Sequence, residues 1–272
     1  MQNKILKIFI ICLIIFSSVL NASNNSVKIK AKRINNKIVV NALNKNPFSI
    51  TVKYKATYSN LKSDKKLPLL LVLKPHSKQK ILTLKILNKH FKFRAKYSWS
   101  IGSKDAKHDN NYLYRLPYKI GTKQMVSQSF NGKFSHYGQS KYAVDFNMKE
   151  GTAIYSARDG KVIKVKSNSN RGGKSRFYAK YANIIIIEHS DKTLASYAHL
   201  KRNGTVVKVN DFVKRGQLIG YSGNTGFTNG PHLHFIVYKA VDGKTRQSIA
   251  IKFLSAKGVI TKPIKGHLYI AK

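Results

Sequence analysis

The chain has 272 residues, of which 42% are hydrophobic and 11% aromatic, so it can bury a sizeable core and is not disordered throughout. Its 51 Lys and Arg outnumber 10 Asp and Glu, which gives a formal net charge of +41. A charge of this size favours polyanionic surroundings, such as nucleic acid, acidic lipid or an anionic cell wall, but it does not define the fold.

The N-terminus has the pattern of a secretory signal peptide. Lys4 and Lys7 precede an apolar run over residues 8–16, and small or polar residues then lead to Ala22. The sequence therefore predicts a signal peptide over residues 1–22 that is cleaved after Ala22. Because the apolar run is shorter than the ~20 residues that span a bilayer, no stable membrane anchor is expected.

Removal of this segment limits the chemistry and the partners of the remaining chain. Cys12, the single cysteine, is lost with it, which excludes disulfides and a cysteine nucleophile. The remaining charge is still about +39. We expect a secreted protein in the periplasm or at the cell wall, in contact with anionic cell-envelope polymers and without a nucleic-acid partner.

Residues 23–115 are predicted to form a small β-sandwich-like domain with a regulatory or wall-targeting role. Alternating apolar positions and polar turns predict its strands at residues 37–42, 48–58, 67–73, 79–87 and 90–99. His76 and His90 lie beside lysine-rich turns, where a solvated histidine is the simplest interpretation. The polar stretch 104–111, which contains His108, is the predicted linker.

Residues 116–250 are rich in glycine turns and predict a second β domain, so the expected fold class is all-β and mainly antiparallel. The run Asn-Ile-Ile-Ile-Ile-Glu-His over residues 183–189 is too short for a typical helix. Its β-branched residues predict a central strand buried on both faces. We interpret residues 251–272 as a basic C-terminal tail that carries no chemistry.

Two histidines on one predicted strand give the strongest local signal. In Pro-His232-Leu-His234-Phe, side chains alternate between the faces of the strand, so both imidazoles point to one side while Leu233 and Phe235 point to the core. Taken alone, this pattern also occurs on exposed strands without any metal.

Further residues of the same kind occur elsewhere in this domain. His136 lies in a turn, and Asp145 follows between apolar neighbours, where a half-buried carboxylate needs a cation or strong hydrogen-bond donors. His199 ends a strand that is predicted to pair back onto residues 183–189. Alone, Asp145 could cap a turn and His199 could be structural.

Together these positions supply one carboxylate and four histidines, a set that suits zinc chemistry. A catalytic zinc takes three protein ligands and leaves a fourth position for water. Two imidazoles then remain to move protons and stabilise an oxyanion. The chain lacks the His-Glu-x-x-His motif, which excludes a helix-based zinc peptidase site.

The sequence resembles the lysostaphin-type zinc metallopeptidases of bacterial cell walls over about residues 118–240. The resemblance rests on six segments in order, which are His136, Ala143-Val-Asp145-Phe, Glu150-Gly-Thr152, Ala157-Arg-Asp-Gly160, Tyr197-Ala-His199-Leu and Gly230-Pro-His-Leu-His234-Phe. It implies that one zinc ion per chain is bound by His136, Asp145 and His234. It also implies that His199 and His232 are the catalytic acid/base and oxyanion-stabilising groups.

Two positions depart from the pattern of that family. Eight residues separate His136 from Asp145, which is longer than the spacing of many members, and Asn210 replaces a common glycine. Asparagine tolerates the left-handed backbone better than most residues, and an extra turn can still bring both ligands together.

The implied function is that of a secreted zinc metalloendopeptidase that hydrolyses peptide cross-links or stem peptides of bacterial peptidoglycan. Some relatives are dead scaffolds that have lost zinc ligands, whereas this chain keeps the full set. The alternative is a non-catalytic cell-wall-binding protein or activator on the same fold.

Overall fold

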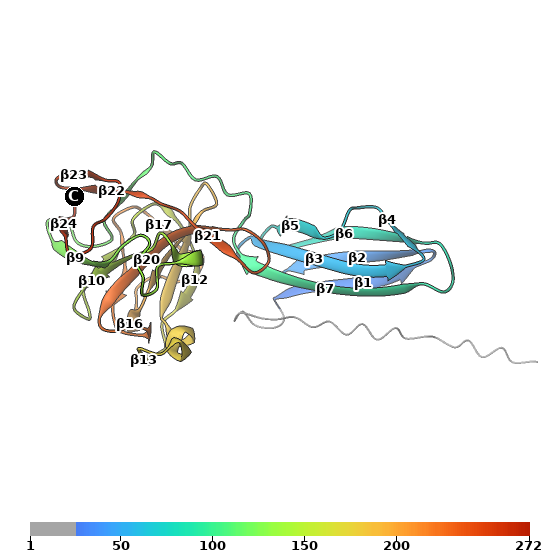
Figure 1. Ribbon diagram of the computed structural model, residues 1–272, viewed down its shortest axis with the longest axis horizontal. Helices are drawn as coiled ribbons and strands as arrows, with labels where there is room; N and C mark the ends of the chain where they lie inside the picture. Colours follow the sequence, from blue (N-terminus) through green and yellow to red (C-terminus); the bar gives the residue numbers. More distant parts are fainter. Residues whose placement is uncertain (1–25) are drawn as a thin grey trace, which may run out of the picture.

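The computed structural model describes residues 26–272, so the predicted signal peptide, residues 1–22, lies outside the described residues. Two β-rich domains follow each other along the long axis, an elongated N-terminal one and a broader C-terminal one (Figure 1). The all-β, mainly antiparallel fold is confirmed. Between residues 26 and 272, no helix has the length and apolar character needed to cross a membrane.

The N-terminal domain is a sandwich of two antiparallel sheets with the strand orders β1-β2-β6-β4 and β5-β3-β7. The strands are β1 (Val27–Ile34), β2 (Lys37–Asn44), β3 (Ile50–Ser59), β4 (Leu61–Ser63), β5 (Leu69–Leu73), β6 (Ser77–Ile86) and β7 (Lys92–Ile101). All five predicted strands are present within a few residues. Sequence analysis missed β1, although its buried Val27 and Ile29 alternate with lysines.

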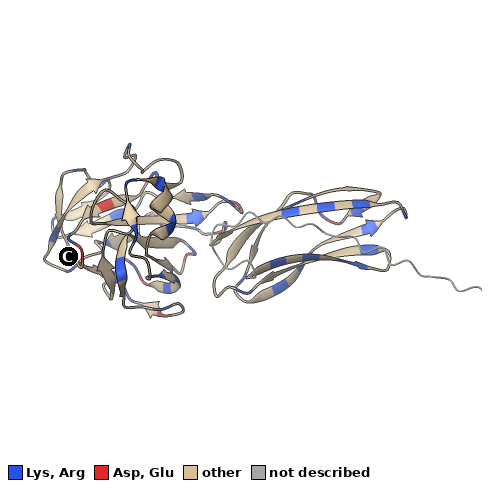
Figure 2. Ribbon diagram, turned by 90° about the horizontal axis from the view of Figure 1, so that it is seen from below, with Lys and Arg blue, Asp and Glu red and all other residues tan. Residues whose placement is uncertain are grey.

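Apolar and polar residues alternate along these strands, so that apolar side chains form the core and lysines form a cationic surface. Val40, Val52 and Leu82 are fully buried between the two sheets. Lysines occupy the outward positions, and register pairs Lys37 with Lys85 across neighbouring strands. Figure 2 shows Lys and Arg positions repeated along the strands of this domain, with few Asp or Glu positions.

The C-terminal domain is built on a nine-stranded sheet with the path β17-β12-β14-β15-β20-β10-β9-β24, to which β21 is added beside β20. Its strands are β9 (Lys123–Gln128), β10 (Val144–Asn147), β12 (Gly160–Lys166), β14 (Ile184–Glu188), β15 (Leu194–Ala198), β17 (Phe212–Val213), β20 (His232–Ala240), β21 (Arg246–Ser248) and β24 (Leu268–Ile270). Each of these pairings is antiparallel.

Smaller sheets and two 3₁₀ helices surround this sheet. They have the orders β11-β18-β16, β13-β19 and β23-β22-β8. Their elements are β8 (Leu113–Arg115), β11 (Ala153–Tyr155), β13 (Gly172–Gly173), β16 (Leu200–Thr205), β18 (Leu218–Ser222), β19 (Gly226–Phe227), β22 (Lys252–Ser255) and β23 (Gly258–Ile260), with the helices η1 (Gly138–Ser140) and η2 (Arg176–Tyr181).

The central strands of the large sheet are covered on both faces. In β14, Ile185 and Ile187 face the main core of the C-terminal domain, together with Phe235. Ile186 faces the other side and belongs to the apolar cluster that continues into the N-terminal sandwich. The prediction of a central strand buried on both faces is therefore confirmed.

Residues 251–272 do not trail away as the predicted basic tail. They form β22, β23 and β24; β22 pairs with β8, and β24 pairs with β9. Sequence analysis missed this because short apolar pieces between lysines gain their burial only from partners far away in the chain. The predicted linker also packs, since Ala106 is buried and His108 stacks on Tyr114.

The two domains meet at the hairpin between β20 and β21. Asp242 in this hairpin forms an ion pair with Lys53 at 3.3 Å, and its carbonyl oxygen accepts a 2.6 Å hydrogen bond from the Ser100 hydroxyl. Gly102 passes so close to Leu194 that a Cβ would lie 2.9 Å from Leu194 Cδ1. The sandwich therefore contacts the sheet at the end opposite to that of His232.

Candidate metal centre

A row of residues across the large sheet forms the base of the site. His234 in β20 pairs with Asp145 in β10 on one side and with Ala198 in β15 on the other, and Asp145 in turn pairs with Gln128 in β9. Directly opposed residues point to the same face of a sheet. The row therefore places a carboxylate beside an imidazole, while the small Ala198 leaves room next to His234.

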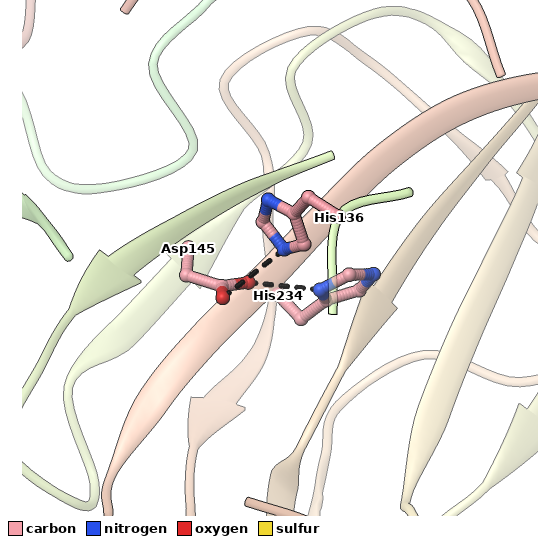
Figure 3. Close-up of side chains that lie close together, drawn as sticks. All are labelled: His136, Asp145 and His234. Carbon is pink, nitrogen blue, oxygen red and sulfur yellow. Dashed lines mark hydrogen bonds and ion pairs between the residues drawn. The ribbon is translucent and has the colours of Figure 1, made fainter. Parts of the chain in front are cut away.

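His136 reaches this row from the loop between β9 and η1. Its backbone N–H donates to the Gly132 carbonyl oxygen at 3.0 Å, and the imidazole is completely buried. Nε2 of His136 lies 3.1 Å from Oδ2 of Asp145, and Nδ1 of His234 lies 2.8 Å from Oδ1 (Figure 3). The long spacing between His136 and Asp145 contains η1, so the extra turn does not keep these side chains apart.

Backbone carbonyls fix the orientation of three imidazoles. The Nδ1–H of His136 donates to the Ser129 oxygen at 2.9 Å, that of His199 to the Thr225 oxygen at 2.7 Å, and that of His232 to the Gly230 oxygen at 2.8 Å. Because Nδ1 carries the proton, Nε2 of each ring holds a lone pair. This is how metal-binding and proton-transferring histidines are usually oriented.

Burial and neighbouring groups set the protonation states of the site. Burial acts to raise the pKa of the Asp145 carboxyl, but the imidazoles of His136 and His234 outweigh it and hold that pKa well below its usual range. Burial, with His232 and His234 nearby, lowers the pKa of His199 to about 3. Burial also lowers the pKa of His234. At neutral pH Asp145 is therefore a carboxylate, and His199 and His234 are uncharged; a carboxylate and a neutral imidazole are the forms that bind metals.

The contacts of His136 test whether these residues fit a metal ion. Its Nε2 is buried and has no hydrogen-bond partner, although the carboxylate of Asp145 lies opposite. A lone pair that faces a carboxylate needs a cation between them. Ligand atoms ~2.1 Å from a tetrahedral zinc lie ~3.4 Å apart, and the 2.8 and 3.1 Å separations here are somewhat shorter than this distance. The donor set therefore fits zinc, and the ligand atoms of His136, Asp145 and His234 lie within 4.8 Å of one another.

The structure also brings the two remaining histidines to this cluster. The ring centroids of His199 and His232 are 4.5 Å apart, and those of His199 and His234 are 5.7 Å apart. His199 follows β15 with a left-handed φ of 67°, which turns the chain sharply at the end of the strand. Nε2 of His232 lies 3.9 Å from Oδ1 of Asp145, beyond hydrogen-bond distance. All five predicted site residues are therefore neighbours.

Sequence analysis missed the residues that support this cluster. The Gln128 amide donates to Asp145 Oδ2 and to the Ser135 hydroxyl, both at 2.8 Å, and its oxygen accepts from the backbone of the His136 loop. Asn183 is fully buried and donates to the carbonyl oxygens of Ser169 and Leu200, the second of which follows His199 in the chain. A polar residue on a strand gives no sequence signal for contacts of this kind.

The cluster opens into a groove with a volume of about 900 Å³. His199, His232 and His234 line it, together with loops that follow β9 and β19. Within residues 26–102, the described part of the N-terminal sandwich, none lines the groove. The sandwich therefore does not cover the site in this structure.

The C-terminal region is similar to known proteins. Residues 139–248 match the family described as Peptidase family M23. This match includes Asp145, His199, His232 and His234. His136 lies a few residues before the matched segment, and the fold brings it next to the other site residues.

Several curated proteins are similar to part of the chain. The Peptidoglycan DD-endopeptidase ShyA of Vibrio cholerae is 33% identical over 122 residues, which cover 43% of this chain and 26% of that protein. Lysostaphin of Staphylococcus simulans is 40% identical over 98 residues, which cover 36% of this chain and 18% of that protein. The alignments thus span about a quarter or less of these two relatives.

A solved structure is also similar to part of the chain. The catalytic domain of lysostaphin from Staphylococcus simulans is 28% identical, with a TM-score of 0.33. The match covers 52% of this chain and 95% of that domain.

Proposed function

Because residues 139–248 match peptidase family M23, we propose that this protein is a zinc-dependent endopeptidase that hydrolyses peptide bonds in bacterial peptidoglycan. The observation that carries the proposal is the buried Nε2 of His136, which faces Asp145 without a hydrogen-bond partner. The similarity to a peptidoglycan DD-endopeptidase supports this substrate class.

His136, Asp145 and His234 would hold the metal. A bound zinc ion acts as a Lewis acid on the scissile carbonyl and makes water a nucleophile at neutral pH. Gln128 fixes the carboxylate through its 2.8 Å hydrogen bond, and the Ser129 carbonyl oxygen fixes the ring of His136. These contacts keep the donor atoms in place before the metal binds, which strengthens metal affinity.

His199 and His232 would act on the substrate instead of holding the metal. Each presents an unprotonated Nε2, because Nδ1–H donates to a backbone carbonyl oxygen. An imidazole in this tautomer accepts a proton at Nε2 and, once protonated, donates a hydrogen bond to a developing oxyanion. Their ring centroids are 4.5 Å apart, so the two imidazoles cannot both be protonated without strong charge repulsion.

We assign the N-terminal sandwich to retention on the cell wall. Residues 23–115 carry 22 Lys and Arg against 3 Asp, and in the described part of this range, residues 26–115, only Lys53 and Lys104 form ion pairs. Unpaired lysines on both sheet faces suit an anionic polymer with repeating charges. The absence of sandwich residues from the groove supports this role over direct occlusion. Residues 1–22 would direct the chain out of the cytosol, to the periplasm or cell wall.

Purified peptidoglycan tests the proposal and the alternative of a non-catalytic wall-binding protein. The zinc-loaded chain should release soluble fragments, and mass spectrometry of the released muropeptides should identify one type of hydrolysed peptide bond. Binding to sacculi without release of fragments, despite stoichiometric zinc, would favour the binding protein.

A further inference from the structure

One wall of the groove consists of aromatic rings that hold an arginine. Phe134 and Phe227 are stacked, with ring centroids 5.3 Å apart and an interplanar angle of 21°. The guanidinium of Arg176, at the start of η2, lies 5.4 Å from the Phe227 centroid and 5.6 Å from that of Tyr137. It also donates to the Tyr137 hydroxyl. Two other loops therefore orient this exposed side chain.

The same loops position the site histidines. Phe134 and Tyr137 lie on either side of His136 in the sequence. Phe227 lies two residues after Thr225, whose carbonyl oxygen holds His199. Arg176 is thus attached to the segments that orient the metal site, and it lines the same groove.

The charges along the groove are strongly unequal. Lys133, Arg176 and Lys265 line it, whereas Asp145 is the single carboxylate among its lining residues and faces the candidate metal. Among residues 26–272, none of these three cations forms an ion pair with an acidic side chain. A guanidinium has five N–H donors, and Arg176 has one protein hydrogen bond, so a planar fork remains available.

We infer that Arg176 is a specificity-determining residue that binds a carboxylate of the peptide substrate. The substrate is therefore an anionic peptide, with a free carboxylate close to the hydrolysed bond, and not a neutral bridge built only from glycine. Arginine pairs with a carboxylate through two parallel N–H···O bonds, which a carboxamide cannot reproduce. This inference rests on the proposed peptidase function, because it names the substrate class of the same groove.

A matched pair of stem peptides tests the inference. One peptide has the free carboxylate, the other has a carboxamide at the same position, and both carry a non-hydrolysable bond in place of the scissile one. Calorimetry measures the binding of both to the zinc-loaded full chain. The wild-type protein should bind the carboxylate peptide about tenfold more tightly. Arg176→Gln should bring the two affinities close to equal, and Arg176→Lys should keep part of the difference.

Arg171 provides the control. It also lies over an aromatic ring, 4.1 Å from the Tyr181 centroid, and donates to that tyrosine's hydroxyl at 2.7 Å, but it does not line the groove. Arg171→Gln removes the same charge and should keep the preference. A preference that survives in Arg176→Gln, as direct binding of the carboxylate to zinc would produce, overturns the inference. Equal affinities in the wild-type protein overturn it as well.

Hydrolysis is measured separately on purified peptidoglycan. A wild-type chain that prefers the carboxylate peptide but releases no fragments would refute the proposed peptidase and leave Arg176 as an anion-binding residue. A chain that releases fragments but shows no preference would refute the role of Arg176 alone. Thermal melting of each variant checks that the fold is retained.

Discussion

The two domains use histidine in opposite ways. In the sandwich, His76 and His90 are exposed at turns and contact no other imidazole or carboxylate side chain. In the C-terminal domain, His136, His199 and His232 each donate from Nδ1 to a backbone carbonyl oxygen and lie around Asp145 and His234. The comparison teaches that a histidine contributes to a site when the fold fixes its tautomer and also directs its ring towards the other residues of the site.

Substitution of the two proposed catalysts gives the largest expected effect on rate. His199→Ala and His232→Ala should each lower kcat by about 10² to 10⁴, because proton transfer and oxyanion stabilisation are lost. Zinc content and melting temperature should stay close to those of the wild-type protein. Turnover of a soluble stem peptide, with metal analysis of the same samples, checks this.

The sandwich supplies the control for this experiment. His90→Ala removes an exposed histidine far from the groove and should leave turnover unchanged. Near-normal turnover by His199→Ala would remove that residue from the mechanism.

Sequence patterns predicted the parts of the site that depend on periodicity. Alternation along β20 correctly placed His232 and His234 on one face, with Leu233 and Phe235 in the core. Asn210 has the left-handed φ of 82° that was expected from its place in a glycine-like turn. These features follow from local backbone geometry, which neighbouring residues specify.

Features that depend on distant partners could not be predicted in the same way. The contact of Gln128 with Asp145 needs the register between β9 and β10, which a sequence does not display. Likewise, residues 251–272 become strands because β8 and β9 offer free edges to them. Asp145 was expected to be half-buried but is 6% exposed, because the His136 loop closes over it.

Substitution of Gln128 extends the comparison, because it removes the contact that orients Asp145 but keeps all three proposed metal ligands. Gln128→Ala should weaken zinc affinity by about 10- to 100-fold, because Asp145 loses the hydrogen bond that fixes it. Gln124→Ala, on the same strand, is the matched control and should keep the wild-type affinity. A competition titration with a chelator measures both. Equal affinities in the two variants would mean that Gln128 has no part in metal binding.

A buried histidine outside the groove predicts a pH effect on stability. Burial lowers the pKa of His189 to about 4, while its Nδ1–H donates to the Asp159 carbonyl oxygen. The unfolded chain, with a pKa near 6.5, binds this proton at higher pH than the folded chain. Stability should therefore fall as the pH drops from about 7 to 5, by about 2 kcal/mol from this group.

His189→Asn keeps a hydrogen-bond donor but cannot titrate in this range. Urea unfolding at pH 7 and pH 5 should show a smaller loss of stability for this variant than for the wild-type protein. Identical losses would show that His189 does not cause the pH dependence.

The charge of the sandwich should have the smallest effect on the rate of hydrolysis, because it acts mainly on binding to the cell wall. Retention on sacculi should fall several-fold as salt rises from low concentration to a few hundred millimolar, because screening reduces the Debye length below ~8 Å. Replacement of the cross-strand pair Lys37 and Lys85 by glutamine should weaken retention but leave turnover of a soluble peptide unchanged. Retention that is independent of salt would contradict the electrostatic role of the sandwich.

The most direct test of the central claim is the zinc content of two variants, His232→Ala and His234→Ala, whose substituted residues lie two positions apart on β20. After dialysis against a mild chelator, the wild-type protein and His232→Ala should each retain about one zinc ion per chain. His234→Ala should retain almost none, because the loss of one of three ligands weakens binding by several kcal/mol. Stoichiometric zinc in His234→Ala, together with its loss from His232→Ala, would contradict the assignment of His136, Asp145 and His234 as the metal site.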